Sequence, residues 1–102
     1  MTFKCTLVYV SCPSQEVAQD LAIKGLKGKL CACANISSPV TSFYIWNREL
    51  KNETEYVVFF KTTVPQSLMA MLQLEHPYDV PAIIALEGET TAPFYRFLMH
   101  EK

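Results

Sequence analysis

Glycine is scarce in this chain, and the patterns that cradle phosphate groups are missing. Only three of the 102 residues are glycine, and none stands in a G-x-G-x-x-G or G-x-x-x-x-G-K-[ST] pattern. The signatures H-E-x-x-H and G-x-S-x-G do not occur either. These absences remove the usual support for nucleotide-binding, metalloprotease and hydrolase functions. The sequence therefore predicts a protein that is not an enzyme.

An excess of positive charge is also lacking. Nine Lys and Arg residues stand against ten Asp and Glu residues, which gives a net charge of −1. General electrostatic binding to nucleic acid needs a basic surface, so we expect no nucleic-acid partner. The apolar run over residues 5–10 ends at Cys12-Pro13-Ser14 and is too short to cross a membrane or to act as a secretory signal. We expect a cytoplasmic protein with no membrane partner.

Cysteine is present four times, but no C-x-x-C pair occurs. Copper chaperones with a ferredoxin-like fold carry such a pair in the loop after their first strand. This chain has only Cys12 at that place. Cys31 and Cys33 alternate on a predicted strand, so their sulfurs would lie roughly 6–7 Å apart on one face, too far for one ion. We expect four free thiols and no disulfide in a cytoplasmic protein.

Hydrophobic periodicity predicts an alternation of strands and helices. Short apolar or β-branched runs predict strands, and three- and four-residue spacing, as in Ala18, Leu21, Ala22 and Leu26, predicts helices. Ser14 and Pro65 are typical of helix starts, and a polar loop is expected around Gly88. The expected strands are 3–10, 30–36, 40–46, 49–63 and 82–86, and the expected helices are 15–27, 65–75 and one from Pro93.

The order of these elements is β-α-β-β-α-β followed by a helix. This order predicts an α+β, ferredoxin-like sandwich in which helices cover one face of an antiparallel sheet, as a single domain over residues 1–102. The central hairpin over residues 30–63 is longer than a small sandwich can cover, and its tip is apolar at Phe43, Tyr44 and Trp46. An exposed apolar ribbon promotes association, so we expect these three residues at a subunit interface. Tyr44 and Trp46 could instead line a ligand pocket.

Several motifs together resemble one known family. They are Cys33-Ala34-Asn35-Ile36, Tyr44-x-Trp46, Lys61-Thr62-Thr63 and His76-Pro77-Tyr78-Asp79-Val80-Pro81. In this order the chain resembles the CutA divalent-cation tolerance proteins over residues 5–100. The resemblance implies a homotrimer that exchanges its long hairpins between subunits. It also implies a role in the response to metal ions, with copper or another divalent cation bound in some members.

The resemblance also implies metal ligands. In one bacterial subgroup the proposed copper ligands are a cysteine at the end of the first strand and two adjacent histidines before Pro-Tyr. Here these positions hold Val10, Glu75 and His76, and Cys12 lies two residues beyond Val10. His76, Cys12 and Glu75 are therefore the candidate metal residues. Alternatively, His76 caps the preceding helix or anchors the loop that starts at Pro77.

Three functions follow from these patterns. The first is a homotrimer in copper tolerance or homeostasis, which binds or senses the metal. The second is a trimer similar to the PII signalling proteins, which binds a small molecule or anion in a cleft near Lys61, Tyr78 and Asp79. For Lys61, a partner such as Asp79 or a bound anion competes with the simpler interpretation of a solvated strand end. The third function is that of a non-catalytic protein that anchors a partner.

Overall fold

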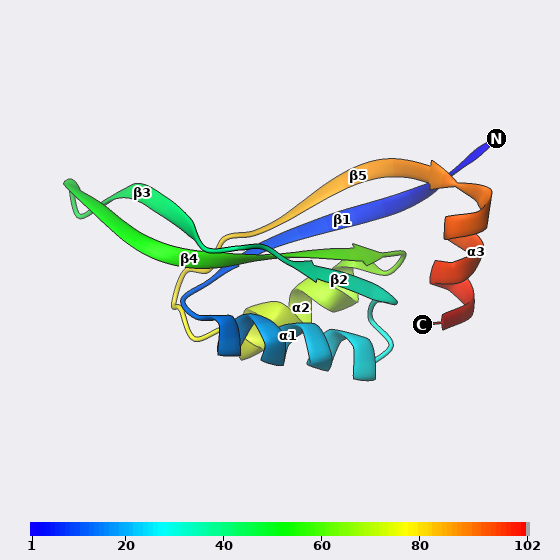
Figure 1. The fold of residues 1–102 in the computed structure, drawn as a ribbon, viewed down its shortest axis with the longest axis horizontal. Helices are drawn as coiled ribbons and strands as arrows, with labels where there is room; N and C mark the ends of the chain where they lie inside the picture. The colour runs from blue at the N-terminus through cyan, green and yellow to red at the C-terminus, as the bar shows by residue number, and fades with distance from the viewer. Residues whose placement is uncertain (102) are drawn as a thin grey trace.

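The computed structural model describes residues 1–101 and consists of a five-stranded antiparallel sheet with two helices beneath it (Figure 1). A third helix lies at the far end of the sheet, beside the N-terminus. In chain order the elements are β1 (Thr2–Cys12), α1 (Gln15–Lys27), β2 (Cys33–Ile36), β3 (Val40–Trp46), β4 (Glu49–Thr62), α2 (Pro65–Glu75), β5 (Ile83–Thr91) and α3 (Ala92–Glu101).

The strand order is β2-β4-β1-β5, and β3 pairs with the outer part of β4. All of these pairings are antiparallel. β4 thus lies in the middle of the sheet, as its run of apolar residues predicts. The order of elements and the placement of α1 and α2 on one face confirm the ferredoxin-like α+β arrangement.

The core lies between the sheet and the two helices. Val8, Val10 and Phe60 of the sheet are fully buried against Leu68 and Leu72 of α2. Alternate residues of the strands point to the opposite face, which none of the helices within residues 1–101 covers (Figure 1). The sheet therefore has one face in the core and one open face.

Helix α1 begins and ends where its sequence predicts. The Oγ of Ser14 accepts a hydrogen bond from the backbone N–H of Val17 at 3.1 Å, and Gly28 follows the last turn. The expected inward position of Leu26 is wrong, because its side chain is 41% exposed while Gly25 is buried. At 100° per residue, Leu26 lies at the margin of the buried face and Gly25 lies near its centre.

Two expected boundaries also differ from the structure. β5 continues through Gly88 to Thr91 instead of ending at Leu86, because it pairs along its whole length with a longer β1, with Lys4 opposite Glu89. β2 starts only at Cys33, since the chain first turns after α1, where Lys29 takes a φ of 59°.

The hairpin of β3 and β4 projects beyond the rest of the sheet (Figure 1). Its two-residue turn, Asn47-Arg48, has φ values of 50° and 65°, which suit the right-handed twist of the strands. Because side chains alternate, Phe43, Ile45 and Leu50 share one face of the hairpin and are 69%, 66% and 70% exposed. The other face carries Tyr44 and Trp46.

Helix α3 packs against the ends of β1 and β5. Leu98 is buried, and the ring of Tyr95 stacks on Phe3 with centroids 4.7 Å apart. The expected inward position of Phe97 is not observed, because this side chain is 42% exposed and stacks on Phe94.

Candidate functional site

A cleft of about 580 Å³ lies between the hairpin, the end of β1 and the loop that follows α2. Its wall consists of aromatic rings, carboxylates and a few small residues. The lining residues are Tyr9, Ser11, Ser42, Tyr44, Trp46, Glu53, Glu55, Tyr78, Asp79, Val80 and Ala82.

Strand alternation brings the hairpin residues to the cleft. Ser42, Tyr44 and Trp46 are every second residue of β3, and Glu53 lies opposite Ser42 on β4. The other wall is the segment 78–82, which follows Pro77 and contains Pro81. Residues 77–80 form bends, and proline disfavours helix in the residue before it, so α2 does not continue into this segment.

The ring of His76 fixes the start of this segment. Its Nε2 lies 2.8 Å from the carbonyl oxygen of Ser11, and its Nδ1 accepts a hydrogen bond from the backbone N–H of Tyr78 at 3.1 Å. Nδ1 therefore carries no proton, and Nε2 donates its proton to the carbonyl. The side chain is buried, and both ring nitrogens are already engaged. In this state the imidazole offers no free lone pair to a metal ion.

Tyr78 joins the segment to the hairpin. Its hydroxyl donates to Oε2 of Glu55 at 2.8 Å, and Glu55 is only 8% exposed. Burial raises the pKa of the Tyr78 phenol well above its ordinary value, and the bond to Glu55 raises it further. The phenol therefore stays protonated and acts as a donor. The hydrogen bonds that join Ser11, His76, Tyr78 and Glu55 link β1, the segment and β4 into one wall of the cleft.

The cleft is acidic. Glu53, Glu55 and Asp79 line it, and no Lys or Arg is among the lining residues. The ion pairs within residues 1–101 join Lys24 to Asp20 and Glu75, and Lys51 to Glu49, so none includes the three cleft carboxylates. Partial desolvation raises the pKa of the Tyr44 phenol, and the neighbouring carboxylate of Glu53 raises this pKa further.

The candidate metal residues are engaged elsewhere. Cys12 is fully buried, and burial together with the charge of Glu55 raises the pKa of its thiol to about 11. Glu75 accepts from Nζ of Lys24 at 2.8 Å on the outer surface, and Val10 is a core residue. No three His, Cys, Asp or Glu side chains come together as metal ligands in the described part of the chain.

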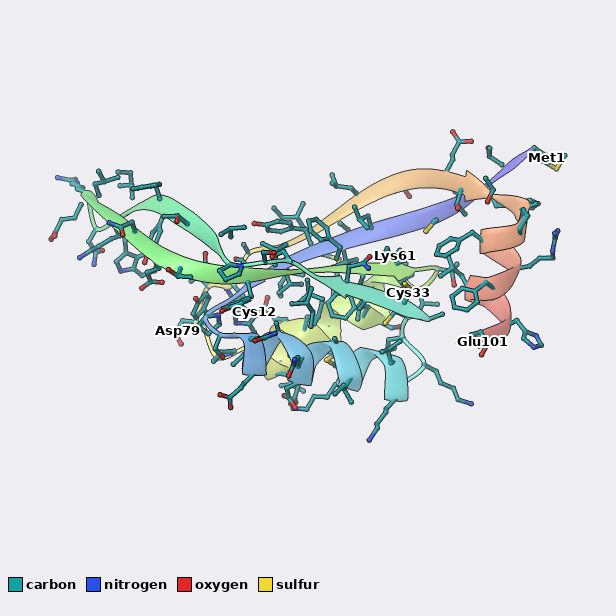
Figure 2. All side chains as sticks on the ribbon, viewed as in Figure 1. Met1, Cys12, Cys33, Lys61, Asp79 and Glu101 are labelled. Carbon is teal, nitrogen blue, oxygen red and sulfur yellow. The ribbon has the colours of Figure 1, made fainter. Side chains whose placement is uncertain are left out.

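Lys61 lies outside the cleft. Its Nζ is 3.5 Å from the sulfur of Cys33, at a distance from Asp79 (Figure 2). Of the three expected cleft residues, the structure brings Tyr78 and Asp79 together and places Lys61 on the open face of the sheet. All four cysteines are free, as their spacing predicts, and Cys12 and Cys31 are buried.

Sequence reasoning missed Glu55 and Ser11. Glu55 has a weak signal, because a carboxylate directly before the apolar run of residues 56–60 is unusual on a central strand. Ser11 contributes a backbone carbonyl, for which a sequence has no signal.

The sheet order, the helices on one face and the long hairpin define a ferredoxin-like α+β protein with a cleft at the base of an extended ribbon. The family described as "CutA1 divalent ion tolerance protein" matches residues 6–102. The chain belongs to this family.

Individual relatives agree with this assignment. The divalent-cation tolerance protein CutA of Citrobacter koseri is 39% identical over 85 residues, which cover 81% of this chain and 74% of the relative. The crystal structure of the divalent ion tolerance protein CutA1 from Ehrlichia chaffeensis is 35% identical, with a TM-score of 0.89 over 94% of this chain and 92% of that one. The periplasmic divalent cation tolerance protein CutA from Archaeoglobus fulgidus is 27% identical, with a TM-score of 0.90. The match covers 95% of this chain and 97% of that one.

Within residues 1–101, no helix has the length and apolar character needed to span a membrane.

Proposed function

We propose that this protein works as a cytoplasmic homotrimer in divalent-cation tolerance, with copper as the first cation to test, and that its role is binding or sensing and not catalysis. Membership of the CutA1 family supports the tolerance role. The observation that carries the assembly is the amount of apolar surface that one copy leaves uncovered.

That surface has two parts. The first is the outer face of the hairpin, with Phe43, Ile45 and Leu50 each about two-thirds exposed. The second is the open face of the sheet, where Ile84 and Leu86 are 49% and 56% exposed beside β1. Apolar area of this extent on both a ribbon and a sheet face is typical of an interface. Burying it between copies would stabilise the protein by roughly 25 cal/mol per Å².

The state of His76 supports a role that does not depend on catalysis by this ring. A general base must have a free nitrogen, and both nitrogens of His76 are hydrogen-bonded within the protein. Direct copper binding by His76 would likewise require the ring to release Ser11 or Tyr78.

A growth experiment tests the tolerance role. A bacterial host without its own CutA1-family gene would be complemented with this chain and grown in graded copper, cobalt and zinc. The proposal expects improved growth in at least one metal, with the protein in the cytoplasmic fraction. Equal growth of complemented and empty hosts in all three metals would contradict it, and recovery in the periplasm would contradict the location.

A second candidate function is that of a small-molecule-binding trimer similar to the PII proteins. The cleft of about 580 Å³ favours it, because this volume is typical of small-ligand sites. Within residues 1–101, the exposed apolar surface is already assigned to the assembly of copies, so a partner-anchoring role has no separate feature in its favour.

A further inference from the structure

We propose that the cleft between the hairpin and the segment 78–82 binds a small organic cation, an alkylated ammonium or amine, between its carboxylates and its aromatic rings. This inference goes beyond the tolerance role, because it names a ligand class that is neither a metal ion nor an anion. It is built from the cleft's charge, its aromatic lining and its volume.

The charge of the cleft is unbalanced. Glu55 is more than nine-tenths buried and lines the cleft, and its hydrogen-bonding partner is the neutral hydroxyl of Tyr78. A carboxylate removed from water is stabilised by a cation beside it, and no cation lies beside Glu55 among the residues that line the cleft. Glu53 and Asp79 add two further negative charges to the same wall, and no Lys or Arg offsets them. A cation is the charged group that this cleft lacks.

The described carboxylates of the cleft do not gather in the number that a bare metal ion requires. Glu53 and Glu55 alternate on β4, so their Cα atoms lie roughly 6.5 Å apart along the strand. A calcium- or magnesium-like ion requires several oxygens within about 2.0–2.6 Å. The part of the chain that the structure describes brings no three acidic, Cys or His side chains together in this way.

The aromatic lining suits an organic cation. Tyr9, Tyr44, Trp46 and Tyr78 line the same cleft as the three carboxylates. The negative face of an aromatic ring attracts ammonium groups, and alkylated ammonium ions lose little hydration when they leave water. A ligand with a positive centre and a small apolar surface therefore matches both kinds of wall residue. An anion would meet three carboxylates instead, since Lys61 lies elsewhere.

Trp46 provides the measurement, because it is the only tryptophan of the chain and lines the cleft. Its fluorescence would be titrated with tetramethylammonium chloride at constant ionic strength. Neopentyl alcohol serves as a neutral probe of similar shape, sodium sulfate as an anion and zinc chloride as a metal ion. The proposal expects a saturable change with tetramethylammonium and at least tenfold weaker responses to the other three probes.

Two substitutions locate the binding. Glu53→Gln removes one exposed charge from the cleft, and Tyr44→Leu removes one ring. Each should raise the dissociation constant for tetramethylammonium about fivefold, as expected for one charge or one cation–π contact. The matched controls, Glu87→Gln on β5 and Phe97→Leu on α3, change the same kind of residue outside the cleft and should leave the constant unchanged.

Several results would overturn the proposal. They are no saturable change with tetramethylammonium, an equal response to the alcohol, sulfate or zinc, or equal effects of the cleft and control substitutions. Protection of Trp46 from quenching by acrylamide, a neutral quencher that the carboxylates do not repel, would also overturn it in the ligand-free protein, because a second copy would then fill the cleft. The mass of the same samples is measured in parallel, so loss of cation binding in an intact trimer refutes this inference alone.

Discussion

At the scale of single residues, His76 shows how a histidine, a residue that often binds metal ions, can instead hold a loop in place. A histidine before proline is compatible with metal binding or with a structural role, and the sequence leaves both open. The deciding partner, the carbonyl of Ser11, lies 65 positions away and contributes no side chain. The structure shows both ring nitrogens in hydrogen bonds, which favours the anchor for this chain.

Replacement of His76 tests this interpretation. His76→Ala would leave the Ser11 carbonyl and the Tyr78 N–H without their partner, so we expect a loss of about 2 kcal/mol in the free energy of unfolding. His76→Gln, which can donate and accept, should recover part of this loss. Urea denaturation measures stability, and calorimetric titration with copper runs beside it. An alanine variant of native stability that has lost copper binding would make His76 a metal ligand instead.

The buried thiols predict how stability changes with pH. Burial raises the pKa of Cys12 and of Cys31 from 9.0 to about 11. Above pH 9 the unfolded chain loses these protons first, so the folded state binds more protons and its stability falls as pH rises. We expect the contribution of these two thiols to the free energy of unfolding to be constant below pH 9 and to decrease between pH 9 and 11.

Each thiol contributes at most about 1.4 kcal/mol per pH unit to this slope. Urea denaturation at steps from pH 7.5 to 10.5, under reducing conditions, measures it. Cys31→Ala should give a shallower slope than the unsubstituted protein. An identical slope in the variant would show that Cys31 does not titrate as its burial predicts.

At the scale of elements, the packing of α1 on the sheet depends on Gly25. A Cβ at this position would lie 3.1 Å from a ring carbon of Phe60 and 3.2 Å from the sulfur of Cys31. Both side chains belong to the core, so they have little room to move. Glycine here costs helix propensity but allows the helix to approach the sheet closely.

Gly25→Ala should therefore destabilise the protein by roughly 1–2 kcal/mol, because overpacking outweighs the gain of about 1 kcal/mol in helix propensity. Gln19→Ala, on the exposed face of α1, is the control and should change stability little. Thermal and urea denaturation measure both variants. A more stable Gly25→Ala variant would show that the core relaxes to accept the methyl group.

The same scale shows what a sequence can predict here. Periodicity and turn residues predict α1, β3 and α2 with the observed bounds, since Ser14, Asn47-Arg48 and Pro65 mark their limits locally. The outer half of β5 was expected to be a loop because Glu87-Gly88-Glu89 has no strand propensity. Its structure comes from pairing with β1, a contact across more than 80 residues.

In the candidate site, too, local features could be predicted and long-range ones could not. Tyr78 and Asp79 could be predicted from a local motif. Glu55 and the acidic character of the cleft could not, because they arise where β4, β1 and the segment after α2 meet.

At the scale of the whole molecule, the apolar face of the hairpin should control assembly. Ile45 and Leu50 lie directly opposite each other on this face. We expect the double variant Ile45→Glu/Leu50→Glu to dissociate, because two carboxylates would be buried without partners at the interface. The control is Leu74→Glu on α2, a leucine that is 80% exposed. Sedimentation analysis measures all three proteins, and a trimeric double variant would exclude this face from the interface.

The most direct measurement is the mass of the unsubstituted protein in solution, by light scattering and sedimentation equilibrium from the micromolar range upward. The account predicts a single species of three times the chain's 11.6 kDa that persists on dilution. A stable species of 11.6 kDa that shows no tendency to associate would mean that the hairpin and the open sheet face tolerate water, and it would contradict the proposed assembly.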